Sequence, residues 1–123
     1  LQTVTELVLQ PQSEIGHFRR FLIENGYEIT HEEMILEDGK YYPIMRAVHG
    51  KAKEQTEAEY LYGKKLLQNR NPVLKEFLDR EQVKAEELLE KLKNSQTPSA
   101  KARISELEKE WKDRKEALTY YEV

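Results

Sequence analysis

Cysteine is absent from this chain of 123 residues, and its three histidines lie far apart in the sequence. These absences exclude a disulfide framework and a thiolate zinc site, and they leave few ligands for any other metal centre. No apolar run approaches the roughly 20 residues of a membrane-spanning helix, and no charged-then-apolar leader opens the chain. We therefore expect a cytoplasmic protein with no metal site and no membrane contact.

The chain is mildly acidic, but its two halves differ in charge. It is 38% hydrophobic and 35% charged with a net charge of −3, which is typical of one soluble domain. Residues 1–50 hold four Lys or Arg against eight Asp or Glu, a net charge of −4, whereas residues 51–123 hold sixteen against fifteen, a net charge of +1. The two halves therefore differ in charge and composition, although the charge balance alone identifies no binding partner.

The strongest local signal is Asp38-Gly39 between the apolar runs 34–36 and 44–45. An Asp-Gly pair supplies the two positive φ angles of a type I′ turn, so the sequence predicts a β-hairpin. The short apolar segment Leu7-Val8-Leu9 predicts an earlier strand, and a helix-spaced apolar set after Ser13, the candidate N-cap, predicts a helix. The expected order is strand, helix, strand, strand.

The second predicted strand has an irregular pattern. Tyr27, Ile29 and His31 share one face of an ideal strand, whereas Met34 and Leu36 share the other. The apolar phase therefore changes near Glu32-Glu33, which predicts a β-bulge there.

The chain has no initiating Met and enters its first predicted strand within about five residues, the usual length of a connecting loop. We therefore expect a segment upstream of residue 1. Three strands and one helix also leave a sheet face and at least one strand edge uncovered, which favours pairing with another chain. That partner is either the upstream segment or a second copy of the chain, which would form a homodimer through the exposed edge.

Residues 72–121 contain two heptad seams separated by a break over residues 94–99. Apolar residues at alternating spacings of four and three predict that the two helices fold back as an antiparallel coiled-coil hairpin. A fold near position 98 places small Ala85 opposite the indole of Trp111, and it places the two seam charges, Glu81 and Arg114, in one layer. We predict that Glu81 and Arg114 pair and set the register of the hairpin, because a displaced register would bury an unpaired charge at a cost of about 3–5 kcal/mol. The first seam consists of Leu74, Leu78, Glu81, Ala85, Leu88 and Leu92, and the second of Ile104, Leu107, Trp111, Arg114, Leu118 and Tyr121.

Three short motifs occur in a joint order along the first half: Leu9-Gln10-Pro11, Asn25-Gly26 and Glu37-Asp38-Gly39-Lys40. Together they resemble the C-terminal part of the bacterial tRNA adenine-N1 methyltransferases that modify adenine 22 and use S-adenosylmethionine. The resemblance covers about residues 5–49 and, more loosely by pattern, about residues 60–118.

The resemblance implies an α/β plus α fold in three parts. Residues 1–50 would be the C-terminal part of a class I, Rossmann-like methyltransferase sheet, residues 51–71 a linker with a short helix near 57–68, and residues 72–123 the coiled-coil hairpin. The segments 7–9 and 27–48 would supply the fifth strand and the sixth and seventh strands, with the seventh between the other two. Pro43 is awkward in such a central strand, so we expect it beyond the paired region, near the hairpin turn.

Cofactor binding in this family lies mostly before residue 1. The glycine-rich turn and the acidic residue that hold S-adenosylmethionine in such folds are missing from this sequence, which has five glycines in all. We therefore expect that the fragment alone neither binds the cofactor tightly nor transfers a methyl group.

The substrate-proximal residues would be Gln10, Pro11 and Gln12, because ligands of open α/β sheets bind outside the carboxyl ends of the strands. The family commonly has Asn at the position of Gln12, which leaves a role for the Gln12 side chain open. The alternative is a simple strand-to-helix turn capped by Ser13. The sequence indicates no catalytic base, since His17, His31 and His49 lack partners at a recognisable spacing.

The predicted tip of the hairpin is basic. Lys91, Lys93, Lys101 and Arg103 occur with no acidic residue between the first and the last. Lys101 and Arg103 lie at the start of the second helix, where the helix dipole disfavours cations, so we predict that the cluster contacts tRNA phosphates. The alternatives are a solvated tip and a non-catalytic coiled-coil module for protein interaction, which exposed Phe77, Val83 and Leu89 would favour. Tyr60 and Tyr62 in the linker either pack internally or stack on bases.

Overall fold

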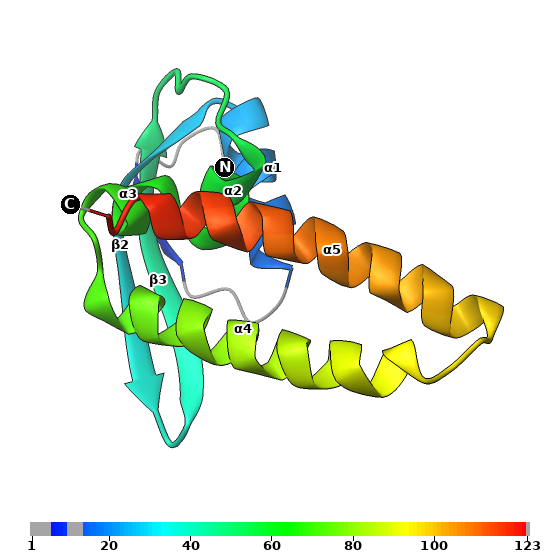
Figure 1. Cartoon of the computed structure of the whole chain (residues 1–123). Coiled ribbons are helices and arrows are strands. Elements are labelled where there is room, and N and C mark those ends of the chain that lie inside the picture. Colours follow the sequence, from blue (N-terminus) through cyan, green and yellow to red (C-terminus); the bar gives the residue numbers. More distant parts are fainter. Residues whose placement is uncertain (1–5, 10–13, 123) are drawn as a thin grey trace.

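The computed structural model describes residues 6–9, as backbone alone, and residues 14–122 (Figure 1). A three-stranded sheet with α1 (Ile15–Glu24) beside it is followed by two short helices and two long ones. The long helices lie side by side and project away from the sheet as an arm.

The sheet has the strand order β1-β3-β2, formed by β1 (Glu6–Leu9), β2 (Tyr27–Glu37) and β3 (Lys40–His49). Both neighbouring pairs are antiparallel, so β1 and β2 run in the same direction with β3 between them. This is the predicted order of a fifth, a seventh and a sixth methyltransferase strand. The last strand of the chain is therefore the central one.

The hairpin turn is confirmed, because Asp38 and Gly39 have φ values of 51° and 76°. Pro43 lies opposite Met34 of β2 but outside the segment of β3, Met45 to Val48, that pairs with β1. The expectation that Pro43 lies beyond the paired region is therefore wrong for the β2–β3 pair, in which Pro43 takes part; only the described pairing with β1 leaves it out.

The β-bulge exists, but its predicted position at Glu32-Glu33 is wrong. The register shifts between Ile29 and His31. Because of this earlier shift, Glu32 and Met34 continue the buried face of the strand that begins with Tyr27 and Ile29. The apolar pattern misplaced the bulge because it treats a glutamate as a surface residue, and here the glutamate is inside.

The two connecting helices are α2 (Glu57–Tyr62) and α3 (Lys64–Gln68), which the sequence predicted as one helix. Gly63, with φ of 95°, separates them. Thr56 and Glu59 form a capping box at the start of α2, with bonds of 3.2 and 2.9 Å. The N-cap of α1 is Glu14 in a left-handed conformation, whereas the predicted cap Ser13 lies outside the described residues.

The arm consists of α4 (Pro72–Lys93) and α5 (Pro98–Thr119). Each helix begins with proline after a capping side chain: Asn71 accepts from Leu74 N at 3.0 Å, and Thr97 accepts from Ala100 N at 3.2 Å. The predicted helical hairpin is therefore present, with a connection over residues 94–97. Its coiled-coil packing stays a prediction.

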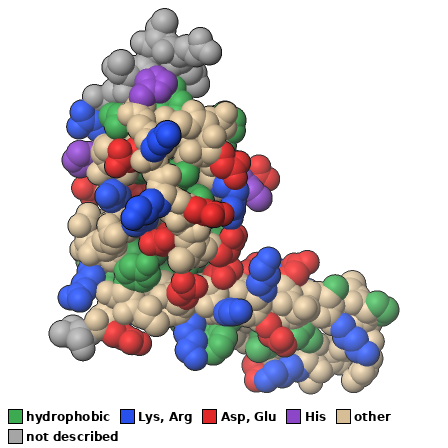
Figure 2. All heavy atoms as spheres, turned by 90° about the horizontal axis from the view of Figure 1, so that it is seen from above, with side chains coloured by type: hydrophobic (Ala, Val, Ile, Leu, Met, Phe, Trp, Pro, Cys, Tyr) green, Lys and Arg blue, Asp and Glu red, His purple; other side chains and the backbone are tan. Residues whose placement is uncertain are grey.

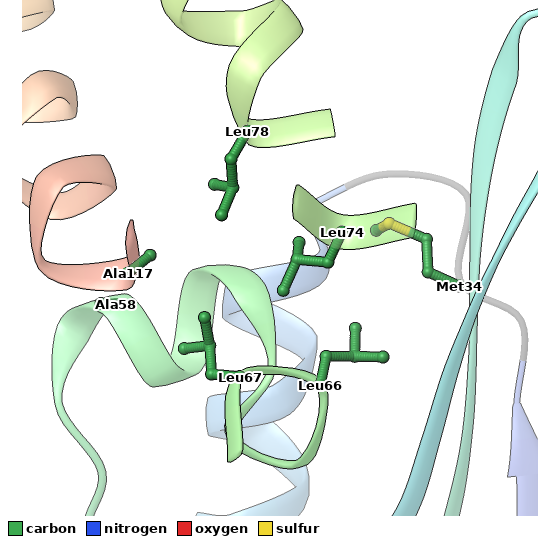
Figure 3. Packing of buried hydrophobic residues seen from close by; sticks show 7 residues of the cluster. All are labelled: Met34, Ala58, Leu66, Leu67, Leu74, Leu78 and Ala117. Atoms are coloured by element: carbon green, nitrogen blue, oxygen red, sulfur yellow. The ribbon is translucent and has the colours of Figure 1, made fainter. Parts of the chain in front are cut away.

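Two clusters of buried apolar residues hold the protein together. One lies between α1 and the sheet and contains Leu22, Tyr27, Ile29, Met45 and Ala47. The other, here called the junction core, gathers side chains that point toward one another from β2 and from all four later helices (Figure 3). It joins the three predicted segments 1–50, 51–71 and 72–123 into one packed unit. The junction core consists of Met34, Ala58, Leu66, Leu67, Leu74, Leu78 and Ala117.

Candidate substrate pocket and basic arm

A buried ion pair links α1 to the bulged strand. Arg19 Nε donates to Glu32 Oε1 at 3.0 Å, and both side chains are 2% exposed. Arg19 Nη1 also donates to the carbonyl oxygens of Tyr60 and Leu61, at 2.8 and 2.9 Å. The second carboxylate oxygen of Glu32 accepts from Leu66 N at 3.4 Å. One ion pair therefore fixes α1, β2, α2 and α3 relative to one another.

The electrostatics of this pair depend on its burial. Burial lowers the pKa of Arg19, and the charge and hydrogen bond of Glu32 oppose that shift. Gly63 packs directly against the pair, and a side chain at this position would collide with Glu32 Oε2. The sequence did not reveal this pair, because charged residues at these positions are typical of a protein surface. The change of the apolar pattern near Glu32-Glu33 was the one feature that could have indicated a buried glutamate.

A cavity of about 340 Å³ opens beside the first turns of α1. We call it the α1 pocket. Its inner wall includes Met34 and Leu74 of the junction core, and Gly16 lets α1 approach α2 there, because a Cβ on it would lie 3.1 Å from Leu61 Cδ2. The pocket is lined by Glu14, Ile15, Gly16, His17, Arg19, Arg20, Met34, Tyr41, Pro43, Glu57, Leu61, Tyr62, Leu74 and Phe77.

The lining of the α1 pocket is mainly apolar, with charged groups from α1 and α2. Arg20 Nη2 donates to Glu57 Oε2 at 2.8 Å, and the Arg20 guanidinium lies 4.2 Å from the ring centroid of Tyr60. A cavity of this kind, within the range of about 300–1,000 Å³ found for ligand sites, suits a flat apolar group with a few polar contacts. Within residues 6–9 and 14–122, no cluster of acidic or histidine side chains could hold a metal ion.

The position of the α1 pocket agrees with the rule for open α/β sheets. β1 ends at Leu9, and Glu14, which lines the pocket, follows it by five residues. The predicted substrate-proximal residues Gln10, Pro11 and Gln12 occupy the connection between them and lie outside the described residues. Of the three histidines, His17 lines the pocket.

The structure gives Arg114 a different direct partner from the predicted Glu81. Arg114 is 4% exposed, and its Nε donates to Gln82 Oε1 at 2.8 Å. The ion pairs found among the described residues include none between Glu81 and Arg114. Seam spacing identifies a layer of the hairpin but does not decide which of two adjacent side chains reaches across it.

Arg114 also affects Tyr62 of α2. Burial raises the pKa of Tyr62, and the charge and hydrogen bond of Arg114 oppose that rise.

The other predicted arm contacts differ in outcome. Ala85 and Trp111, predicted to lie opposite each other, line the same open groove between the helices, and Trp111 is 46% exposed. Phe77 packs edge-on against Tyr41, with ring centroids 5.0 Å apart, whereas Val83 is 53% exposed. Tyr60 is 3% exposed, which favours internal packing over base stacking.

Acidic neighbours partly neutralise the predicted basic tip. Arg103 Nη1 lies 2.8 Å from Glu106 and 3.4 Å from Glu110, and Lys93 lies 3.7 Å from Glu90. Lys91 and Lys101 are exposed and belong to none of the ion pairs found in the described part of the chain. Figure 2 accordingly shows both signs of charge along the arm.

A sequence profile of tRNA (adenine(22)-N(1))-methyltransferases matches residues 1–116. The chain belongs to this family. The resemblance inferred from the short motifs is therefore confirmed, and so is the predicted Rossmann-like context of the sheet, since one similar structure is of a protein in the NADB-Rossmann superfamily. Within the described ranges, no helix of this family member is long and apolar enough to cross a membrane.

Three of the solved structures similar to this chain illustrate the likeness. An uncharacterized protein from Listeria monocytogenes is 28% identical, with a TM-score of 0.88 over 95% of this chain and 52% of that one. The NADB-Rossmann protein, from Streptococcus agalactiae, is 31% identical, with a TM-score of 0.76 over 95% and 49%. A putative tRNA (m1A22) methyltransferase from Streptococcus pneumoniae, in complex with S-adenosyl-L-methionine, is 26% identical, with a TM-score of 0.71 over 94% and 48%. This chain thus spans about half the length of these proteins, and no curated protein sequence matches it.

Proposed function

We propose that the chain is the C-terminal half of an S-adenosylmethionine-dependent methyltransferase that modifies N1 of adenine 22 in tRNA. The family match over residues 1–116 carries this proposal, and the strand order β1-β3-β2 supports it. In this function the chain supplies the substrate side of the sheet, and the upstream half of the protein supplies the cofactor site. The free edge of β1 is where the upstream sheet would continue; a homodimer through an exposed edge stays a prediction.

Among the described residues, no glycine of positive φ stands in a strand-to-helix turn of the kind that holds S-adenosylmethionine. Gly26 follows α1, Gly39 lies in the hairpin turn and Gly63 separates two helices, so none of these positive-φ glycines leads from a strand into a helix. The cofactor therefore belongs to the full-length protein, and this chain alone is expected to be inactive. The chain's own contribution is to bind and orient the RNA.

The α1 pocket is the proposed place for the target adenine. A base must leave its stack before N1 can be methylated, and an apolar pocket with a few polar groups suits a flipped base. Gln10, Pro11 and Gln12 precede Glu14, which lines the pocket, by two to four positions in the sequence. The amides of Gln10 and Gln12, with Pro11 to fix the backbone between them, are therefore candidates to orient the adenine. The rigid support comes from the Arg19–Glu32 pair behind α1.

The arm is the proposed holder of the tRNA. Lys91, Lys93, Lys101 and Arg103 lie in the last turn of α4 and the first turns of α5, at the end of the arm. The ion pairs of Lys93 and Arg103 with glutamates are solvent-exposed and therefore contribute little that a phosphate contact would have to replace. Phosphate contacts of this kind give affinity without base specificity.

The direct test is methyl transfer by the full-length protein. The protein is incubated with methyl-labelled S-adenosylmethionine and either an unmodified tRNA transcript or the same transcript with guanine at position 22. We expect one labelled 1-methyladenosine in the first transcript and none in the second. Equal labelling of both transcripts, or of neither, would contradict the proposed function.

A further inference from the structure

A second hollow, of about 350 Å³, lies between the turn of the β2–β3 hairpin and α4. We call it the hairpin groove. Lys40 lines it from β3, and Arg80 and Lys84, one helical turn apart, line it from α4. Glu81 is the one acidic residue in its lining. Three cations against one carboxylate make the groove basic, although the chain as a whole is acidic.

The cations of the hairpin groove are not neutralised as those of the tip are. Lys40, Arg80 and Lys84 appear in none of the ion pairs found among residues 14–122, whereas Lys93 and Arg103 of the tip are paired with glutamates. All three groove cations are exposed. Their charge is therefore available to an incoming anion.

Arg80 is held in place by an aromatic ring. Its Nη1 donates to the Tyr41 hydroxyl at 3.4 Å, and its guanidinium carbon lies 5.3 Å from the Tyr41 ring centroid. These contacts position the guanidinium without cancelling its charge, and most of its five N–H donors stay free for a ligand. A guanidinium fixed in this way loses less entropy when it binds a phosphate.

The hairpin groove adjoins the α1 pocket. Tyr41 and Phe77, packed edge-on, line both hollows and form the wall between them. An RNA strand whose phosphates lie in the groove would therefore place the adjoining nucleotide beside the α1 pocket. Tyr42, half-buried, also lines the groove and offers an aromatic face of the kind on which bases stack.

We propose that the hairpin groove binds the phosphodiester backbone of the tRNA, with Lys40, Arg80 and Lys84 contacting phosphates next to the adenine that enters the α1 pocket. This inference rests on the proposed function and adds a second RNA contact to the arm. RNA fits better than an acidic protein, because the groove combines unpaired cations with aromatic rings and leads to a pocket of suitable size for a base.

The test measures the affinity of the full-length protein for tRNA as a function of salt concentration. The variant is K40Q/R80Q/K84Q, and the control is K51Q/K53Q, which removes exposed lysines that lie outside both the groove and the arm. Three lost phosphate contacts should weaken binding about a hundredfold at 0.1 M salt and reduce the slope of log K against log salt by about 2 to 3. The control should retain affinity and slope.

A second variant, K40Q/K84Q, leaves the Arg80–Tyr41 packing intact and should reduce the slope by about 1.5. Equal affinities and slopes for wild type, groove variants and control would overturn the proposal that the groove binds phosphates. The proposed function would still stand if these proteins methylate adenine 22. A wild-type protein that binds no tRNA would overturn both proposals. Retained tRNA binding together with lost binding of an acidic protein would assign the groove to that partner instead.

Discussion

At the junction, seven apolar side chains from five elements are buried together, whereas along the arm, over residues 79–113, Ala100 and Leu107 are the apolar side chains that are buried. The junction also contains the Arg19–Glu32 pair and the hydrogen bond from the Tyr120 hydroxyl to Glu59, at 3.1 Å. The arm relies on two helix caps, exposed ion pairs and one buried arginine.

This difference fits the roles proposed for the two regions. The junction over-determines the positions of α1, α2 and α4 around the α1 pocket, as a site that orients a reacting group requires. The arm keeps most of its side chains exposed, which suits a surface that contacts a large polyanion through long flexible cations. Mutations at the junction should therefore act mainly on stability, and mutations of the basic residues at the tip of the arm mainly on RNA binding.

The largest expected effect is at the buried ion pair. Glu32→Ala leaves Arg19 charged and unpaired in the interior, so we expect a loss of about 3–5 kcal/mol in the free energy of unfolding, measured by urea denaturation. Glu57→Gln, which breaks the exposed pair with Arg20, should cost less than about 1 kcal/mol. The double change Arg19→Met with Glu32→Leu should recover most of the loss. Equal costs for the two single changes would remove the contrast between junction and surface.

A second comparison uses one leucine from each region. Leu78 is fully buried in the junction core, so Leu78→Ala should cost about 2–5 kcal/mol. Leu107 lines the open groove of about 250 Å³ on the arm, where water can fill the space, so Leu107→Ala should cost less than half as much. Chemical denaturation of both variants measures the loss in the free energy of unfolding for each. A larger loss for Leu107→Ala than for Leu78→Ala would show that the arm contains a core of its own.

The contact between Arg114 and Gln82 sharpens the comparison at the root of the arm. Gln82→Ala removes the acceptor of a buried guanidinium and should cost about 1–3 kcal/mol. Glu81→Gln should cost less, because Glu81 makes no ion pair with Arg114 among the described residues. Thermal unfolding of both variants tests this order. The reverse order would restore Glu81 as the partner that sets the register.

The smallest effect concerns alkaline pH. Burial raises the pKa of Tyr121 to about 12, and its hydroxyl donates to the Asn71 carbonyl oxygen at 2.8 Å. A folded-state pKa above the unfolded value of about 10 gives a stabilisation that is complete below pH 10 and is lost as pH rises toward 12. The stability of Tyr121→Phe should therefore fall less steeply over this range. Identical slopes for the two proteins in urea titrations would contradict the assignment.

Local signals in the sequence predicted much of the fold. Asp38-Gly39 predicted the hairpin, and the break after Lys93 predicted two antiparallel helices. The strand order followed from the resemblance to the methyltransferase family. These features depend on turns, caps and periodicity, which neighbouring residues determine.

The candidate site was much less predictable, because it depends on contacts between distant residues. Glu32 is buried only because the bulge lies two positions earlier than the pattern indicated, and because Arg19 from α1 meets it there. The α1 pocket needs side chains from α1, both long strands, α2 and α4. No spacing rule brings these together. The resemblance predicted a site at Gln10, Pro11 and Gln12, and the α1 pocket became visible only in the structure.

The division between a site that orients the adenine and an arm that holds the tRNA is tested most directly by steady-state kinetics of the full-length protein. Two variants are compared: K91Q/K93Q/K101Q/R103Q at the tip and Pro11→Ala, which loosens the backbone of the predicted substrate-proximal segment. We predict a higher KM for tRNA with nearly unchanged kcat for the tip variant, and a lower kcat with nearly unchanged KM for Pro11→Ala. A tip variant with unchanged KM, or one that loses kcat alone, would contradict this division.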